Sequence, residues 1–238
     1  MQLNKILFLD VETVSQTESY NQLNEDMAFL WREKYKQIKL RSPEKYSEDS
    51  SEESSYADTG LFAEFGKIAC ISMGFLFKEE DDYHLKLKSI YGEKEDDILT
   101  QFADILYKLD GKGFFLCGHN AREFDVPYIA RRMIINNIRL PQIIQNARGK
   151  QWESPVLDTM EMWRFGDYKH YTSLKLLCHT LNIPSPKDDI DGKDVYHVFY
   201  LEHDLERIAH YCEKDVLATV QVFLRLNGFD LIKEEHIL

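Results

Sequence analysis

The stretch Lys5-Ile6-Leu7-Phe8-Leu9-Asp10-Val11-Glu12 decides the fold that we expect for this chain. An unbroken apolar run of this kind is typical of a strand buried on both faces. Such strands lie in the middle of a sheet that has helices on both sides. Asp10 and Glu12 are two residues apart, so on a strand their side chains point to the same face.

Two neighbouring carboxylates on a buried strand repel each other and are costly to desolvate. A divalent cation would remove both costs. The alternative is that the strand ends at Leu9 and that both acids meet solvent. The spacing of Asp10 and Glu12 alone is compatible with both interpretations.

The segments that follow predict one domain over residues 1–238, with an α/β fold built on a mixed central sheet flanked by helices. Residues 67–77 and 83–91 are predicted to form a hairpin, and residues 113–118 a short buried strand. Helical spacing of apolar residues predicts five helices, over residues 20–40, 96–109, 124–137, 173–181 and 201–226.

Residues 41–60 differ from the rest of the chain. They hold six acidic and two basic residues, many serines and few apolar side chains. This composition is typical of a solvated, mobile loop. Because only one strand precedes it, we interpret the segment as an insertion into the domain.

The overall charge argues against one class of protein. Across 238 residues, 29 Lys and Arg stand against 41 Asp and Glu, which gives a net charge of −12. This excludes a uniformly basic nucleic-acid binder but not a local basic surface. Residues 121–175 hold nine basic against six acidic residues, so a surface that contacts phosphates is expected there.

The chain lacks the marks of a membrane or secreted protein. Apolar runs such as residues 114–117 are far shorter than the roughly 20 residues of a membrane-spanning helix. The N-terminus does not have the pattern of a signal peptide. The four cysteines are far apart, in apolar contexts, and we expect buried free thiols and a cytoplasmic location: Cys70, Cys117, Cys178 and Cys212.

The expected last helix has one acidic residue on an otherwise largely apolar face. Its positions recur in steps of three and four residues: Leu205, Ile208, Cys212, Asp215, Thr219, Val222 and Leu226. Asp is rarely buried without a partner. Tyr211 lies one turn before Asp215 and is therefore its neighbour. A core Asp paired with a Lys or Arg is the alternative to a functional carboxylate.

A third polar site follows the expected strand at residues 113–118 and begins the next helix. Ligands in open α/β folds usually bind at the carboxyl ends of strands, where Asp125 would lie. The alternative is that Asp125 caps the helix, with Pro127 in its first turn. With Asp10, Glu12 and Asp215, this residue completes an all-oxygen set that favours Mg²⁺ or Mn²⁺ over zinc.

These residues resemble the three exonuclease motifs of the DEDD superfamily. The matching patterns are Asp10-x-Glu12, Asn120-x3-Phe124-Asp125 and Tyr211-x3-Asp215. Tyrosine four residues before the last Asp is similar to the tyrosine (DEDDy) branch. Ser173-Leu174 resembles a Ser-Leu motif of family B DNA polymerase proofreading domains. The chain is most similar to stand-alone predicted 3′–5′ exonucleases related to that domain, from residue 1 to about 226 except for residues 41–60.

The resemblance implies a ribonuclease-H-like fold and two-metal hydrolysis at the 3′ end of single-stranded DNA or of a 3′ overhang, releasing nucleoside 5′-monophosphates. It implies that four carboxylates hold two Mg²⁺ or Mn²⁺ ions, the first bridging both: Asp10, Glu12, Asp125 and Asp215. Tyr211 would orient the attacking water. Five residues would position the last nucleotides, the first through its backbone: Thr13, Asn120, Phe124, Ser173 and Leu174.

Several alternatives stay open at this point. RNA or short oligonucleotides could replace DNA as substrate, because discrimination at the 2′-OH depends on pocket shape. A catalytically silent binding module is a further alternative. A DNA repair or nucleotide-recycling role and a polymerase partner are both compatible with the sequence.

Other polar residues near the motifs receive simpler interpretations. Lys187 and Lys193 lie where the family B proofreading domains use a catalytic lysine, and the pattern does not select either. Asp158 and Glu161 have the spacing of a helix cap. Four more acids are interpreted as loop and cap residues: Asp188, Asp189, Asp191 and Asp194.

Overall fold

A computed structural model describes residues 2–47, 49–150, 152–167, 169, 171–184 and 190–238. Its centre is a mixed five-stranded sheet with the spatial order β3-β2-β1-β4-β5. β1 is antiparallel to β2 and parallel to β4, and it is the middle strand. The strands are β1 (Ile6–Ser15), β2 (Gly66–Glu79), β3 (Asp82–Tyr91), β4 (Phe115–Gly118) and β5 (Val156–Asp158).

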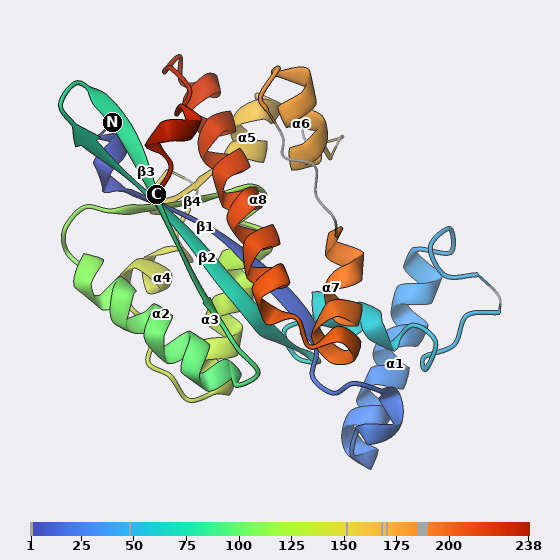
Figure 1. Ribbon diagram of the computed structural model, residues 1–238. Coiled ribbons are helices and arrows are strands. Elements are labelled where there is room, and N and C mark those ends of the chain that lie inside the picture. Colours follow the sequence, from blue (N-terminus) through green and yellow to red (C-terminus); the bar gives the residue numbers. More distant parts are fainter. Residues whose placement is uncertain (1, 48, 151, 168, 170, 185–189) are drawn as a thin grey trace.

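Helices cover both faces of this sheet. In Figure 1, α8 crosses one face, while α2 and α3 lie against the other. The predicted mixed sheet flanked by helices is therefore confirmed. The α-helices are α1 (Glu25–Arg41), α2 (Glu95–Leu109), α3 (Asp125–Ile135), α4 (Gln142–Asn146), α5 (Thr159–Arg164), α6 (Leu174–Thr180), α7 (Val195–His197) and α8 (Leu205–Leu226).

The alternation of side chains along β1 separates two cores. Leu7 and Leu9 pack in the cluster beneath α2 and α3. Phe8 faces the other side, where its ring meets that of Phe223 on α8 edge-on at 5.3 Å. Asp10 and Glu12 follow in the alternation of Phe8, so they face α8. A register shift between Glu12 and Thr13 marks a β-bulge at the end of this acidic stretch.

The expectation of a solvated loop over residues 41–60 is wrong for its aromatic side chains. Tyr46 and Tyr56 are buried in one cluster with Trp31 and Tyr35 of α1. The Trp31 indole also donates a hydrogen bond to the Glu52 carbonyl at 2.8 Å. The composition of residues 41–60 is polar on average, so it does not reveal the effect of two aromatic residues. Tyr46 and Tyr56 pack against α1 and attach the segment to it. Figure 1 shows α1 standing away from the sheet.

Short elements and element ends account for the other differences. β5, α4 and α7 were not predicted, and of α5 only the cap was, because three to six residues show no measurable periodicity. β1 runs on to Ser15, so the strand does not end at Leu9. The last helix begins at Leu205, after a π-helical turn over Val198–Glu202. None of the described helices has the length and apolarity that a membrane crossing requires.

Candidate active site

Asp10 and Glu12 lie in the interior of the sheet. In the register of the two central strands they pair with Ser72 and Cys70 of β2. Glu12 is only 9% exposed and Asp10 is half-buried. Both carboxylates therefore lie on the central strand and not in solvent beyond its end. This agrees with the interpretation that Asp10 and Glu12 are neighbours on a buried strand.

Asp125 does not cap α3. It is the first residue of the helix, and the capping position before it belongs to Phe124, which makes no side-chain cap bond. The buried Asp125 carboxylate instead accepts a hydrogen bond from the Val11 backbone N–H at 3.2 Å. Val11 lies between Asp10 and Glu12, so this bond brings the third carboxylate to the first two.

The fourth carboxylate comes from α8. Asp215 is half-buried, and its charge contributes to raising the pKa of Asp10, of Glu12 and of Asp125. Tyr211, one turn earlier, is half-buried at the edge of a hydrophobic cluster. Its hydroxyl lies about 4 Å from where a side chain on Gly192 would begin. The structure therefore gathers the four predicted acids around the middle of β1.

The electrostatics of the cluster are unfavourable without a cation. Burial, followed by repulsion from the neighbouring acids, raises the pKa of Asp10 well above its ordinary value. Burial does the same to the pKa of Glu12. Burial raises the pKa of Asp125 to about 7, against the effect of its hydrogen bonds. Negative charges in this environment fit a divalent cation, which offsets both desolvation and repulsion.

Cys212 is a member of the cluster that sequence reasoning did not assign. Its Sγ lies 3.3 Å from Asp10 Oδ2, and ligating atoms of Asp10, Glu12 and Cys212 all lie within 4.8 Å of one another. Burial raises the pKa of the Cys212 thiol well above its ordinary value, so the thiol stays protonated and donates to Asp10. The available ligands are then carboxylate oxygens, which suit Mg²⁺ or Mn²⁺.

The loop before α3 has a fixed conformation. At Gly118 a Cβ would lie 3.0 Å from the Leu9 carbonyl oxygen and 2.5 Å from the Ala121 Cβ, so a side chain would not fit. Asn120 has φ of 63°, in the left-handed region that Asn tolerates better than most residues. The buried Asp158 accepts from the backbone N–H groups of Asn120 and Arg122, at 3.0 Å each.

Asp158 also has its predicted role as a helix cap. Its carboxylate accepts from the N–H groups of Met160 and Glu161 at the start of α5, at 2.9 and 3.3 Å. One buried carboxylate thus serves both α5 and the loop that positions Asp125. The capping spacing was visible in the sequence, whereas the contact with the loop depends on β4 and β5 being neighbours.

The residues expected to contact nucleotides fall into two groups. Thr13 and Phe124 lie beside the carboxylates in the chain and are half-buried, with Thr13 Oγ1 donating to the Gly60 carbonyl at 2.8 Å. Ser173 accepts from the Leu176 N–H as the cap of α6, and Leu174 packs in a separate hydrophobic cluster. In the described part of the chain, these contacts of Ser173 and Leu174 are with α6 and that cluster and not with the acids.

Asn120 leaves a polar group unsatisfied. Within the described part of the chain, its buried Oδ1 has no hydrogen-bond partner. Buried side-chain oxygens normally have a partner in the protein or in ordered water, so an exception calls for an explanation. This observation is consistent with a ligand contact by Asn120.

His119 is a second residue whose importance sequence reasoning missed. Its ring nitrogens bond to Thr159 Oγ1 and to the Thr172 carbonyl, at 2.9 Å each. Burial lowers its pKa, so the ring is neutral at physiological pH. His119 therefore connects the loop before α3 to Thr172, which directly precedes Ser173. A polar side chain directly after a buried strand was the signal available in the sequence.

The remaining candidates lie outside the cluster or outside the described residues. Lys187, Asp188 and Asp189 are among the residues that the structure does not describe. Lys193 is exposed and lies 3.6 Å from the Asp191 carboxylate. Asp191 and Asp194 cap each other's backbone, as expected for cap residues.

The mixed sheet and its acidic cluster define an α/β protein with a candidate metal-dependent hydrolase site. Residues 61–234 match the family described as predicted 3′–5′ exonuclease related to the exonuclease domain of PolB. The chain belongs to this family of nucleic-acid hydrolases. Asp10 and Glu12 precede the matched residues, which include Asp125 and Asp215. The pairing of β1 with β2 and β4 brings all four acids into one cluster.

A solved structure supports the expected fold. The family B DNA polymerase from the hyperthermophilic archaeon Pyrobaculum calidifontis matches with a TM-score of 0.54 at 14% identity. The match covers 92% of this chain and 24% of the polymerase, so the chain spans about a quarter of that protein. The likeness confirms the ribonuclease-H-like fold. A search of curated proteins finds no match.

Proposed function

We propose that the protein removes nucleotides from the 3′ end of single-stranded DNA or of a 3′ overhang and releases nucleoside 5′-monophosphates. The observation that carries this proposal is the gathering of Asp10, Glu12, Asp125 and Asp215 around the middle of β1, where Asp125 accepts from the Val11 N–H and burial raises the pKa of the first three. Such a cluster is costly for the fold, and a role in binding cations explains why it is present.

The four carboxylates would hold two Mg²⁺ or Mn²⁺ ions. When bound, a pair of such cations neutralises charge on the attacking and leaving oxygens of a phosphodiester and activates water. Asp125 is held in place by the Val11 N–H, and the Cys212 thiol fixes one oxygen of Asp10. These two hydrogen bonds would limit the freedom of the carboxylates before a cation binds.

Tyr211 would orient the attacking water. Phenols are poor bases near neutral pH because their ordinary pKa is about 10. We therefore assign Tyr211 a hydrogen-bonding role and not that of a general base. Its position one turn before Asp215 on α8 puts it beside a proposed metal ligand.

Phe124 and Asn120 would hold the terminal nucleotides. Phe124 is half-buried, with its ring 5.4 Å from that of Tyr128. Stacking of a base on an aromatic ring contributes about 1–3 kcal/mol and tolerates every base. The proposal therefore implies little sequence preference. Ser173, Leu174 and the backbone of Thr13 are proposed to complete these contacts.

The direct test is the degradation of matched DNA and RNA strands in Mg²⁺ or Mn²⁺. With a 5′ label, the DNA strand should shorten stepwise; with a 3′ label, the first product should be the labelled mononucleotide. A much higher rate on RNA would contradict the preference for DNA and favour the exoribonuclease alternative. Internal cuts, or activity that survives in the Glu12→Gln variant, would contradict the proposal.

A further inference from the structure

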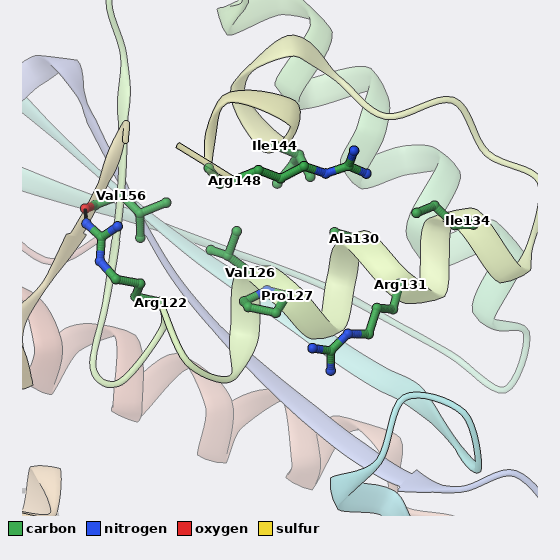
Figure 2. A pocket seen from close by; sticks show the side chains of 10 residues that line it. Arg122, Val126, Pro127, Ala130, Arg131, Ile134, Ile144, Arg148 and Val156 are labelled. Carbon is green, nitrogen blue, oxygen red and sulfur yellow. Dashed lines mark hydrogen bonds between the residues drawn. The ribbon is translucent and has the colours of Figure 1, made fainter. Parts of the chain in front are cut away.

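A pocket of about 230 Å³ lies between α3 and α4. Figure 2 shows its apolar side chains, with three arginines around them. The apolar part comes from both helices and from β5: Val126, Pro127, Ala130, Ile134, Ile144, Ala147 and Val156. Ile134 is 53% exposed. The pocket is therefore a concave apolar surface that is exposed to solvent, and such surfaces often mark a binding site.

The three arginines differ in how they are paired. Arg122 is held by the Glu161 carboxylate and the Val156 carbonyl, so its charge is compensated. Arg131 and Arg148 are exposed, and their side chains have no hydrogen bond or ion pair among the residues that the structure describes. In a chain of net charge −12, two uncompensated guanidinium groups beside an apolar pocket fit a ligand that is both flat and anionic.

We propose that this pocket binds one nucleotide of the substrate strand, upstream of the 3′ end that enters the acidic cluster. The base would lie on the apolar surface, and the adjoining phosphates would contact Arg131 and Arg148. This inference rests on the proposed exonuclease function and names a second contact area for the same substrate.

Position and size support a nucleotide. α3 begins with Asp125 and Arg131 follows six residues later, about 9 Å further along the helix axis. A strand that leaves the acidic cluster along α3 would reach the pocket within a few nucleotides. The cavity is smaller than the roughly 300–1,000 Å³ of sites for drug-sized ligands, so it suits a single base and not a larger group.

The test measures KM as a function of strand length for wild type and for the Arg131→Ala/Arg148→Ala double variant. For an octanucleotide, we expect the double variant to raise KM about tenfold. For a dinucleotide, which is too short to reach the pocket, KM should match that of wild type. The salt dependence of octanucleotide binding should weaken by about 1.4 in the log–log slope, since each lost contact with single-stranded DNA contributes about 0.7.

A matched control removes two positive charges elsewhere. Lys108 and Lys112 are exposed and do not line the pocket, so the Lys108→Ala/Lys112→Ala variant should keep the wild-type length dependence and salt slope. The second probe is Ala130→Phe, which would fill the apolar surface and should raise KM for the octanucleotide without changing the salt slope. This variant separates the base contact from the phosphate contacts.

The outcomes distinguish the two proposals. If wild type degrades strands from the 3′ end and the arginine variant has the same length dependence and salt slope, the pocket does not bind the strand and this inference is wrong. If wild type degrades neither DNA nor RNA, the proposed function itself fails. An equal loss in the lysine control would attribute the effect to net charge and would also overturn the inference.

Discussion

The negative charge of Asp10 destabilises the folded protein, but the proposed metal site requires it. Its carboxylate lies on the central strand, close to three other acids, and its raised pKa records the free energy that this arrangement costs. Each unit by which a pKa is raised corresponds to about 1.4 kcal/mol of disfavoured ionisation. At this position a change that removes charge should therefore improve folding and impair catalysis.

We expect the Asp10→Asn variant to lower exonuclease activity by about 10³-fold or more, because a metal ligand contributes several kcal/mol to transition-state stabilisation. The same variant should increase the free energy of unfolding of the metal-free protein at pH 8 by about 1 kcal/mol or more. Denaturant titrations and single-turnover assays measure the two effects. Asp104→Asn, at an exposed position on α2, should change neither. Equal activity in Asp10→Asn would remove this residue from the proposed site.

Tyr211→Phe should separate water orientation from metal binding. Loss of the hydroxyl is expected to lower kcat about 10²-fold, the lower range for a group that assists proton movement. The affinity for Mn²⁺ should stay at the wild-type value, since the tyrosine is not a proposed ligand. The exposed Tyr91 gives the control variant Tyr91→Phe. A large loss of Mn²⁺ affinity in Tyr211→Phe would assign the residue to the metal site instead.

At the scale of elements, a buried ion pair holds the helices beneath the site together. Glu95 at the start of α2 and Arg132 on α3 are 8% and 5% exposed, and their side chains form two hydrogen bonds. Glu95 also accepts from the Ile68 N–H of β2 at 2.8 Å. The pair therefore sets the position of α3, whose first residue is Asp125.

The Arg132→Met variant leaves a buried carboxylate without its partner, and we expect it to lower the free energy of unfolding by about 3–5 kcal/mol. Adding Glu95→Gln should recover part of this loss, because Gln is uncharged and still accepts from Ile68. Urea denaturation of the single and double variants measures the difference. A single variant as stable as wild type would show that the pair does not position α3. Arg131→Ala, one residue away and exposed, is the matched control and should stay within about 0.5 kcal/mol.

The elements that could be predicted from the sequence are those whose apolar residues recur with a clear period. Elements too short to show such a period were missed. β2, β3, α2 and α8 carry long alternating or helical patterns, and the structure has them within a few residues of the expected bounds. β5 has three residues, and its contribution, the Asp158 carboxylate, acts on a loop 38 residues away in the chain. Contacts of this kind follow from the order of strands, which a local pattern does not contain.

The same distinction applies within the candidate site. The motif spacing named the four acids, and their placement around the middle of β1 follows from sheet and helix geometry. Cys212 and His119 were missed as parts of the site, because their contacts with Asp10 and with Thr172 form only when distant segments meet. Residues 41–60 were interpreted from composition, which gave no weight to Tyr46 and Tyr56.

For the whole molecule, the acidic cluster couples stability to pH and to metal. Folding raises the pKa of Asp125 from its ordinary value near 4 to about 7, and it raises those of Asp10 and Glu12 well above normal. The folded protein then binds more protons than the unfolded chain in this range. The contribution of these groups to stability is therefore present below about pH 4 and is lost as the pH rises through about 7.

Divalent cations should reverse this loss. The carboxylates bind a cation when ionised, so we expect Mg²⁺ or Mn²⁺ to raise the melting temperature more at pH 8 than at pH 5. At a hundredfold excess over Kd the gain is about 2.7 kcal/mol. Thermal denaturation with and without EDTA measures it, and the Asp10→Asn/Glu12→Gln double variant should lose the metal effect. The absence of any shift at millimolar metal would contradict the proposed site.

Two-metal binding by the four carboxylates can be seen directly in a crystal soaked with Mn²⁺ and a deoxynucleoside 5′-monophosphate, recorded at a wavelength where manganese scatters anomalously. We predict two anomalous peaks about 3.5–4 Å apart among Asp10, Glu12, Asp125 and Asp215, with the nucleotide phosphate beside them and its base against Phe124. Density that places manganese away from these four carboxylates, or a nucleotide bound elsewhere on the protein, would contradict it.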